Sequence, residues 1–85
     1  VLFHNDKACI AFGGYAASAG RVEDCDFLNN TCFENDRVRS GFGELWIQLG
    51  DDSRVRNNVF HAGPQNLLLT AETPGAGLDL DHNLW

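Results

Sequence analysis

The stretch Arg54-Val55-Arg56-Asn57-Asn58-Val59-Phe60 contains the pattern apolar-x-x-Asn-x-apolar, which occurs twice more in the chain. The upstream copy is Phe27-Leu28-Asn29-Asn30-Thr31-Cys32, and the downstream copy is Leu80-Asp81-His82-Asn83-Leu84-Trp85. Asn30 and Asn58 are 28 positions apart, and Asn58 and Asn83 are 25 positions apart. A period in this range is typical of proteins in which copies of one unit stack on each other. The sequence therefore predicts a repeat structure.

The first residues match the same repeat. Val1-Leu2-Phe3-His4-Asn5-Asp6 is similar to Thr31-Cys32-Phe33-Glu34-Asn35-Asp36, at an offset of 30 positions. We therefore expect residues 1–85 to form a single segment that begins and ends inside a repeat, as an internal slice of a longer domain. Both ends of such a slice would expose unpaired strand edges, so we expect end-to-end self-association if the segment is isolated.

The composition argues against some partners. The chain has 12 acidic and 6 basic side chains and a formal net charge of −6, whereas a nucleic-acid partner requires a basic stripe. No run approaches the ~20 apolar residues of a membrane span, and no signal peptide is visible. The three cysteines, an odd number without metal-ligand spacing, are predicted to be free and mostly buried thiols. No metal site is predicted.

Short alternating runs, bounded by Gly, Asn, Asp and Pro, predict three short strands in each repeat. The predicted first strands are Ile10–Phe12, Leu45–Leu49 and Leu67–Thr70, and the second strands cover 22–28, 53–56 and 78–81. Turns are expected at 13–20, 50–53 and 71–77. The third strand is short, with Leu2, Cys32, Phe60 and Trp85 pointing inward. A second register, with Phe33 inward and Cys32 bulged, also fits the sequence.

Three strands per repeat at this period predict an all-β, parallel β-solenoid of about three coils. Each position should then lie next to its equivalent in the following coil, about 4.8 Å away. Asn30, Asn58 and Asn83 should form a hydrogen-bonded ladder, in a turn whose left-handed backbone Asn tolerates. Asp26, Arg54 and Asp79 should form an outward column of alternating charge.

The repeats "FLNNTCFEND", "VRNNVFHAG" and "LDHNLW", with the strand "ELWIQLG", resemble the right-handed parallel β-helix of the pectate lyase-like superfamily. The resemblance covers essentially the whole chain and implies a right-handed parallel β-helix with three strands per coil. It also implies an extracellular or cell-surface protein that acts on or binds a polysaccharide. No cofactor is identified from the residues, although the resemblance alone allows a bound Ca²⁺.

The resemblance places a substrate along the outer face of the first strand, beside the loop that follows the third. That face would carry Glu44, Trp46, Gln48, Asn66, Leu68 and Thr70. An outward Trp46 could stack on a sugar ring, and Arg37 or Arg39 on the loop could bind the carboxylate of an acidic sugar. In the alternative interpretation, the loop covers Trp46, which then only packs.

The sequence does not identify catalytic residues. The pair Asp51-Asp52 is typical of a turn. Asp79 is expected to pair with Arg54. His4 and His61 are expected to be exposed or hydrogen-bonded. One hypothesis is that this segment is part of a polysaccharide lyase or glycoside hydrolase that acts on acidic polysaccharide, with its catalytic residues outside the segment. The alternative is a non-catalytic glycan-binding or adhesion module, or a structural spacer.

Overall fold

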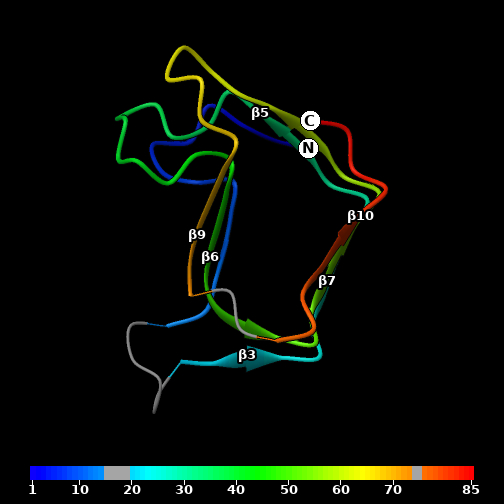
Figure 1. The fold of residues 1–85 in the computed structure, drawn as a ribbon. Helices are drawn as coiled ribbons and strands as arrows, with labels where there is room; N and C mark the ends of the chain where they lie inside the picture. The colour runs from blue at the N-terminus through cyan, green and yellow to red at the C-terminus, as the bar shows by residue number, and fades with distance from the viewer. Residues whose placement is uncertain (15–19, 74–75) are drawn as a thin grey trace.

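The short β-strands of the chain form the sides of a frame that surrounds the core (Figure 1). A computed structural model describes residues 1–14, 20–73 and 76–85. The described residues contain strands and connecting turns but no helix. The ten strands are β1 (Leu2–Phe3), β2 (Ile10–Phe12), β3 (Val22–Glu23), β4 (Asp26–Leu28), β5 (Thr31–Phe33), β6 (Leu45–Asp51), β7 (Arg54–Arg56), β8 (Val59–His61), β9 (Leu69–Thr73) and β10 (Asp79–Asp81).

The strands pair in parallel and form three sheets. One sheet has the order β1-β5-β8 and a second has the order β10-β7-β4. In the third, β6 pairs with β2, β3 and β9. Strands β6 and β9 lie along one side of the frame, β7 and β10 lie opposite, and β5 lies along a third side (Figure 1). The chain passes through the three sheets in a constant order: β1, β2 and β4, then β5, β6 and β7, then β8, β9 and β10. Each such passage is here called a circuit. Equivalent residues of successive circuits are therefore neighbours in a sheet.

The run 22–28, predicted as one strand, is two: β3 pairs with β6, β4 pairs with β7, and Asp24 between them has a left-handed backbone with φ 52°. The rest of the register of the second and third predicted strands is confirmed. Arg54 lies opposite both Asp26 and Asp79, as the outward column of alternating charge requires. Cys32 is fully buried and lies between Leu2 and Phe60, whereas Phe33 is 39% exposed. The register with Cys32 inward is therefore correct, and the alternative with Phe33 inward is not.

A ladder of asparagine side chains joins successive circuits after the second strand. The backbone N and the Nδ2 of Asn30 both donate to Oδ1 of Asn58, at 2.8 and 3.0 Å. Asn58 donates in the same way to Oδ1 of Asn83, with both distances 3.0 Å. The predicted ladder is confirmed. The left-handed residues, however, are those immediately before the ladder: Asn29, Asn57 and His82, with φ between 54° and 59°.

A second, shorter ladder begins near the N-terminus and ends on a carboxylate. The backbone N and Nδ2 of Asn5 donate to Oδ1 of Asn35, at 3.0 and 2.8 Å. Asn35 in turn donates from its backbone N and its Nδ2 to the two carboxylate oxygens of Glu44, both at 2.7 Å. Glu44 therefore occupies the place that the next asparagine would take in this ladder.

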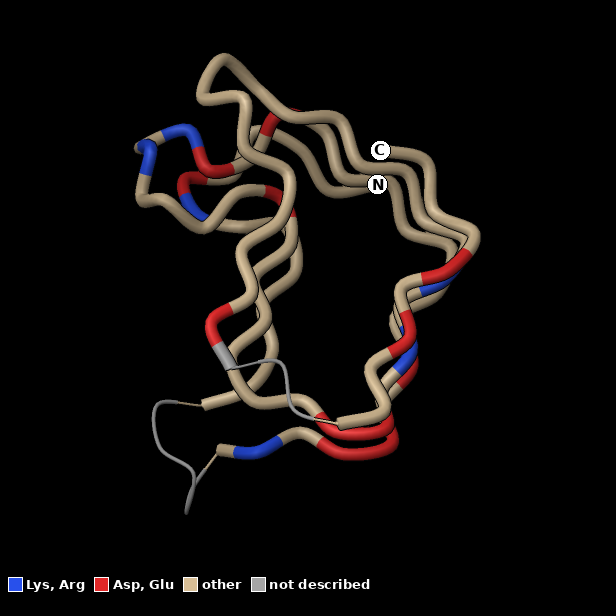
Figure 2. Tube along the Cα trace, viewed as in Figure 1, with Lys and Arg blue, Asp and Glu red and all other residues tan. Residues whose placement is uncertain are grey.

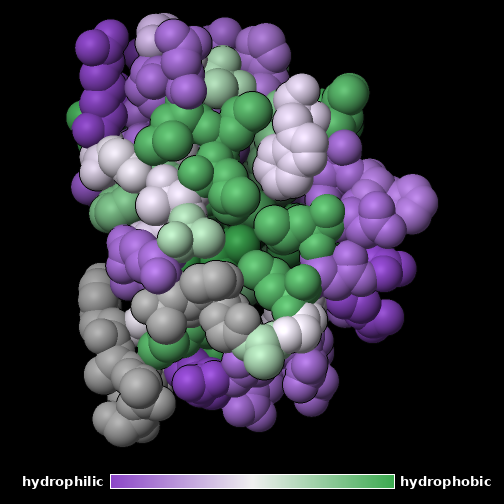
Figure 3. All heavy atoms as spheres, viewed as in Figure 1, coloured by the Kyte–Doolittle hydropathy of each residue, from purple (hydrophilic) through white to green (hydrophobic). Residues whose placement is uncertain are grey.

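Apolar side chains fill the space that the strands enclose, and polar side chains surround them (Figure 3). The buried cluster comprises Ile10, Phe12, Cys32, Leu45, Ile47, Val55 and Phe60. Leu2 and Trp85, predicted to point inward, are 41% and 48% exposed. They belong to the first and last circuits, which have a neighbour on one side only, although Trp85 still stacks on Phe60.

A disulfide bond joins Cys9 to Cys32, with their Cα atoms 5.8 Å apart. The prediction of three free thiols is therefore wrong for this pair, and Cys25 alone is free. Cys9 immediately precedes β2, and Cys32 lies in the middle of β5. The bond therefore links the sheet that contains β2 and β6 to the buried face of the sheet β1-β5-β8.

The strand predicted at Leu67–Thr70 is observed at Leu69–Thr73, two residues later at its start and three residues later at its end. Thr70 lies opposite Trp46. Leu68, predicted to face outward, packs against the core and is half-buried. The turns predicted at 13–20 and 71–77 include residues 15–19 and 74–75, which lie outside the described residues.

Candidate functional site

The loop that follows β5 is organised around the buried carboxylate of Asp36. Its Oδ1 accepts a hydrogen bond from the backbone N of Ser40 at 2.8 Å and another from the Ser40 hydroxyl. Its Oδ2 accepts hydrogen bonds from three successive backbone N–H groups, those of Gly41, Phe42 and Gly43, at 3.1–3.2 Å. Burial acts to raise the pKa of Asp36, but the hydrogen bonds from Ser40, Gly43 and Phe42 outweigh it and lower the pKa.

We expect Asp36→Asn to destabilise the protein by about 2 kcal/mol at neutral pH, because an amide cannot accept all of these hydrogen bonds. Because folding lowers the pKa of Asp36, its contribution is complete above the unfolded value of about 3.9 and is lost as the pH falls through the lower folded value. Urea unfolding between about pH 7 and pH 3 should therefore show a weaker acid dependence for Asp36→Asn than for the wild type. Equal pH dependence in the two proteins would contradict the assignment. Asp6→Asn, at an exposed position, is the matched control.

The loop places an aromatic ring against Trp46. The rings of Phe42 and Trp46 stack with their centroids 3.7 Å apart and their planes 7° from parallel. The Nζ of Lys7 lies 5.6 Å from the centroid of the Phe42 ring. These three residues, with Ala8 and Ala11, line a hollow of about 360 Å³, here called the aromatic hollow.

Trp46 remains accessible although the loop contacts it. Its side chain is half-buried, and its Nε1 donates a hydrogen bond to the exposed carboxylate of Glu72 at 3.0 Å. Opposite Trp46 in the sheet lie Ala11 on β2 and Thr70 on β9. The small side chain of Ala11 leaves the space that becomes the hollow. Trp46 is thus both packed against the loop and part of an open surface.

Arg37 and Arg39 do not lie in the aromatic hollow. Both are exposed, and they line a separate hollow of about 230 Å³ with Asp36, Pro64 and Gln65. The structure therefore does not bring the two arginines into the same hollow as Trp46, and Lys7 is the cation that lines it.

Paired and unpaired cations lie in different parts of the molecule (Figure 2). Arg21, Arg54 and Arg56 form ion pairs with Asp51, Asp26 and Asp79 respectively. Asp79 lies opposite Arg54 in the sheet, but the predicted ion pair between them is wrong, since Asp79 pairs with Arg56. Among the described residues, Lys7, Arg37 and Arg39 have no such partner, and all three lie on the loops beside β2 and β6. The unpaired cations of the described residues therefore lie on these loops, which also carry the exposed Asp6 and the buried Asp36 and Glu44.

Gln48 lies on the same face of β6 as Trp46, whereas Glu44 lies in the interior. Gln48 is half-buried on β6, where alternation places it on the same face as Trp46. Glu44, predicted on the outward face, is fully buried, and both of its oxygens accept hydrogen bonds from Asn35. It is therefore a structural residue of the second ladder and cannot contact a ligand in the hollow.

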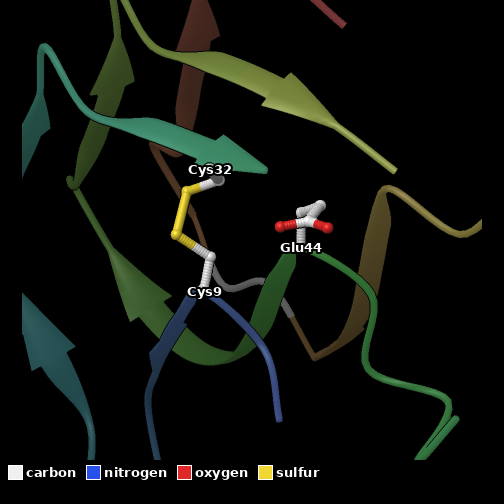
Figure 4. Close-up of side chains that lie close together, drawn as sticks. All are labelled: Cys9, Cys32 and Glu44. Atoms are coloured by element: carbon white, nitrogen blue, oxygen red, sulfur yellow. A yellow bond between two sulfur atoms is a disulfide. The ribbon is translucent and has the colours of Figure 1, made fainter. Parts of the chain in front are cut away.

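Glu44 also lies near the disulfide, and its carboxylate is within 4.8 Å of the sulfur atoms of Cys9 and Cys32 (Figure 4). This arrangement does not make a metal site. The sulfur atoms are bonded to each other, and thiolates are the form in which cysteine binds metals.

The carboxylates that the sequence singled out lie on the other side of the molecule. Asp52 has a left-handed backbone, with φ 47°, as expected for a turn residue. The Asp51 carboxylate accepts hydrogen bonds from the backbone N of Ala76, at 3.0 Å, and from Arg21; together these interactions lower its pKa. Asp51 is thus used in structure rather than placed against a second carboxylate for acid–base chemistry.

The sequence analysis missed Lys7 and Phe42, which line the aromatic hollow, and Glu72, which accepts a hydrogen bond from Trp46. One feature of the sequence could have indicated Phe42, since it is the only aromatic residue in the Gly-rich run Ser40-Gly41-Phe42-Gly43. No feature indicated Lys7, because the position of its loop depends on contacts with residues about 30 positions away. The backbone N of Asp36, for example, donates to the carbonyl oxygen of Lys7 at 2.9 Å.

Comparisons with models of protein families, with curated proteins and with solved structures found no match for this chain. The described residues include no helix with the length and apolar character required to cross a membrane.

Proposed function

We propose that the chain is a segment of a right-handed parallel β-helix of the pectate lyase-like type. Three observations support this proposal: the parallel pairing of all strands, the return of the chain past three sheets in a constant order, and the asparagine ladder. The proposed handedness follows the strong preference of parallel strand connections for right-handed crossovers.

We further propose that this segment binds an acidic polysaccharide at the aromatic hollow. The observation that carries this proposal is the Phe42–Trp46 stack beside a hollow that Lys7 also lines. Aromatic faces stack against flat apolar surfaces such as those of sugar rings, and an ammonium group attracts a carboxylate or sulfate on the same sugar. Arg37 and Arg39 are exposed on the adjacent loop and form no ion pair among the described residues, so they add two positive charges that favour an anionic chain over a neutral one.

The role proposed for the aromatic hollow is binding rather than catalysis. A glycoside hydrolase uses two carboxyl groups that flank the scissile bond, and the residues that line the aromatic hollow include none. In this proposal, the lyase or hydrolase activity implied by the resemblance is therefore not assigned to the aromatic hollow.

We propose an extracellular or cell-surface location. The supporting observation is the Cys9–Cys32 disulfide, because such bonds form and persist mainly in oxidising compartments.

Calorimetric titration with an oligogalacturonate tests the binding proposal. We expect Trp46→Ala and Lys7→Ala each to weaken binding by about 1–2 kcal/mol, the range for a stacked or charge-assisted contact. The Lys7 effect should decrease as salt is added. Arg39→Ala is the matched control for loss of one positive charge and should have the smaller effect, since Arg39 lines the other hollow.

Two outcomes would contradict the proposal. Binding that is unchanged in Trp46→Ala and Lys7→Ala, with the fold intact by circular dichroism, would leave the aromatic hollow without a ligand role. Equal affinity for a neutral oligosaccharide of the same length would remove the preference for acidic sugars.

A further inference from the structure

The turn between β4 and β5 carries the sequence Asn29-Asn30-Thr31. It matches the pattern Asn-x-Ser/Thr, with a residue other than proline in the middle, at which an oligosaccharide is attached to the asparagine in secreted proteins. No other asparagine of the chain has Ser or Thr two positions later. The sequence therefore offers a single acceptor of this type, Asn29.

The structure leaves the Asn29 side chain accessible. Asn29 is exposed and has a left-handed backbone, with φ 59°. Its backbone N donates to the carbonyl oxygen of Arg56 at 3.3 Å, which holds the turn against the next circuit. Among the described residues, this is the only hydrogen bond that Asn29 donates, so a group attached to its Nδ2 would displace no donated bond in this part of the chain.

Asn30, the next residue in the turn, is used differently. Its Nδ2 donates to Oδ1 of Asn58 at 3.0 Å and to the carbonyl oxygen of Leu28 at 3.1 Å. A sugar on this nitrogen would disturb the ladder. The turn thus uses one of its two asparagines for structure and leaves the other, Asn29, open to solvent.

Thr31 departs from the residues at the equivalent positions of the repeat. It lies opposite Val59, which in turn lies beside Leu84. Both of those side chains are apolar, and the Thr31 hydroxyl makes no hydrogen bond among the residues that the structure describes. Packing in this column therefore does not require a hydroxyl. Attachment of an oligosaccharide to Asn29 does require one, because Ser or Thr at this position is part of the recognised pattern.

We propose that Asn29 is the attachment site of an N-linked oligosaccharide. In the transfer, a bond forms between Nδ2 of Asn29 and the anomeric carbon of the first sugar. The bond between that carbon and the pyrophosphate of a lipid-linked oligosaccharide donor breaks, and the lipid pyrophosphate leaves. The amide loses one proton, and no group is oxidised or reduced. The modification places a bulky, solubilising group at the surface.

The proposed attachment site is separate from the aromatic hollow. Its turn joins the sheet β10-β7-β4 to the sheet β1-β5-β8, whereas the hollow is lined by residues of β2, β6 and the adjoining loops. The proposal rests on the proposed extracellular location, because oligosaccharides are attached to this pattern in secreted proteins. It does not depend on polysaccharide binding.

Synthesis of the chain in the secretory pathway of a eukaryotic cell tests the site. We expect the wild type to carry one glycan, seen as an electrophoretic shift that a peptide N-glycosidase removes, whether the chain is secreted or retained in the cell. This enzyme converts the modified asparagine to aspartate, so mass spectrometry should locate the change at Asn29. Asn29→Gln and Thr31→Ala should lose the shift completely, and Thr31→Ser should retain it.

Asn57 supplies the matched control. It is the exposed, left-handed residue of the equivalent turn, with φ 58°, but it has Val59 two positions later. Asn57→Gln should retain the single glycan, and Val59→Thr should add a second one at Asn57. An unmodified wild type, or a glycan that persists in Asn29→Gln, would overturn the proposal. Thiol titration of the same sample tests the location separately, since an intact Cys9–Cys32 bond without a glycan would reject the attachment site and leave the proposed location in place.

Discussion

Reduction of the Cys9–Cys32 disulfide should destabilise the chain by about 3 kcal/mol, the entropic value for a loop of this length. The two cysteines are 23 positions apart, so the bond removes many conformations from the unfolded chain. Urea unfolding with and without a reducing agent measures the difference. We expect Cys9→Ala with Cys32→Ala to lower the free energy of unfolding by a similar amount and to make the chain insensitive to the reducing agent.

Cys25→Ala is the control for this experiment, because Cys25 is free and only half-buried. Its stability should stay within about 0.5 kcal/mol of the wild type and should still fall on reduction. Thiol titration of the unreduced protein should find one reactive cysteine. Three reactive thiols, or a wild type whose stability does not change on reduction, would show that the bond is absent.

Asn58→Ala should destabilise the protein by about 3 kcal/mol, the upper end of the range for unsatisfied buried groups. Asn58 is the middle member of the ladder, and it is 1% exposed. Its Oδ1 accepts two hydrogen bonds from Asn30, and its Nδ2 donates to Phe27, Arg56 and Asn83. Truncation leaves partners on both neighbouring circuits without hydrogen bonds, and equilibrium unfolding in urea measures the loss.

The neighbouring Asn57 supplies the control. It is exposed and left-handed, with φ 58°. Alanine would add backbone strain at this position, whereas glycine adopts positive φ freely. Asn57→Gly should therefore change the free energy of unfolding by about 0.5 kcal/mol or less. Equal losses in Asn58→Ala and Asn57→Gly would contradict the ladder.

The sequence predicted those parts of the structure that depend on spacing. Parallel neighbours keep a constant offset along the chain. The spacing of Asn30, Asn58 and Asn83 therefore determines the ladder. The same spacing determines the sheet register that places Arg54 between Asp26 and Asp79. Where the sequence lacks alternation, the prediction was wrong. Leu67-Leu68-Leu69 is a continuous apolar run, so nothing in it distinguishes an inward residue from an outward one.

The candidate site was predicted only in part. Alternation along β6 placed Trp46 on the accessible face. It failed for Glu44, which precedes the strand and turns inward because Asn35 offers two donors. The Cys9–Cys32 bond was missed because cysteine spacing does not define connectivity. Phe42 stacks on Trp46, with Lys7 over the Phe42 ring, because Asp36 fixes the shape of the loop through contacts that have no sequence signature.

The contrast between the two ladders bears on how this architecture can change in length. An asparagine both accepts from one neighbour and donates to the next, so the column of Asn30, Asn58 and Asn83 could incorporate an inserted copy of the repeat at any point. Glu44 only accepts, so it terminates its column after Asn35 and leaves the next circuit free to carry Gly63 and a shorter loop. Duplication of whole circuits and variation of the loops beside the aromatic hollow can therefore proceed independently.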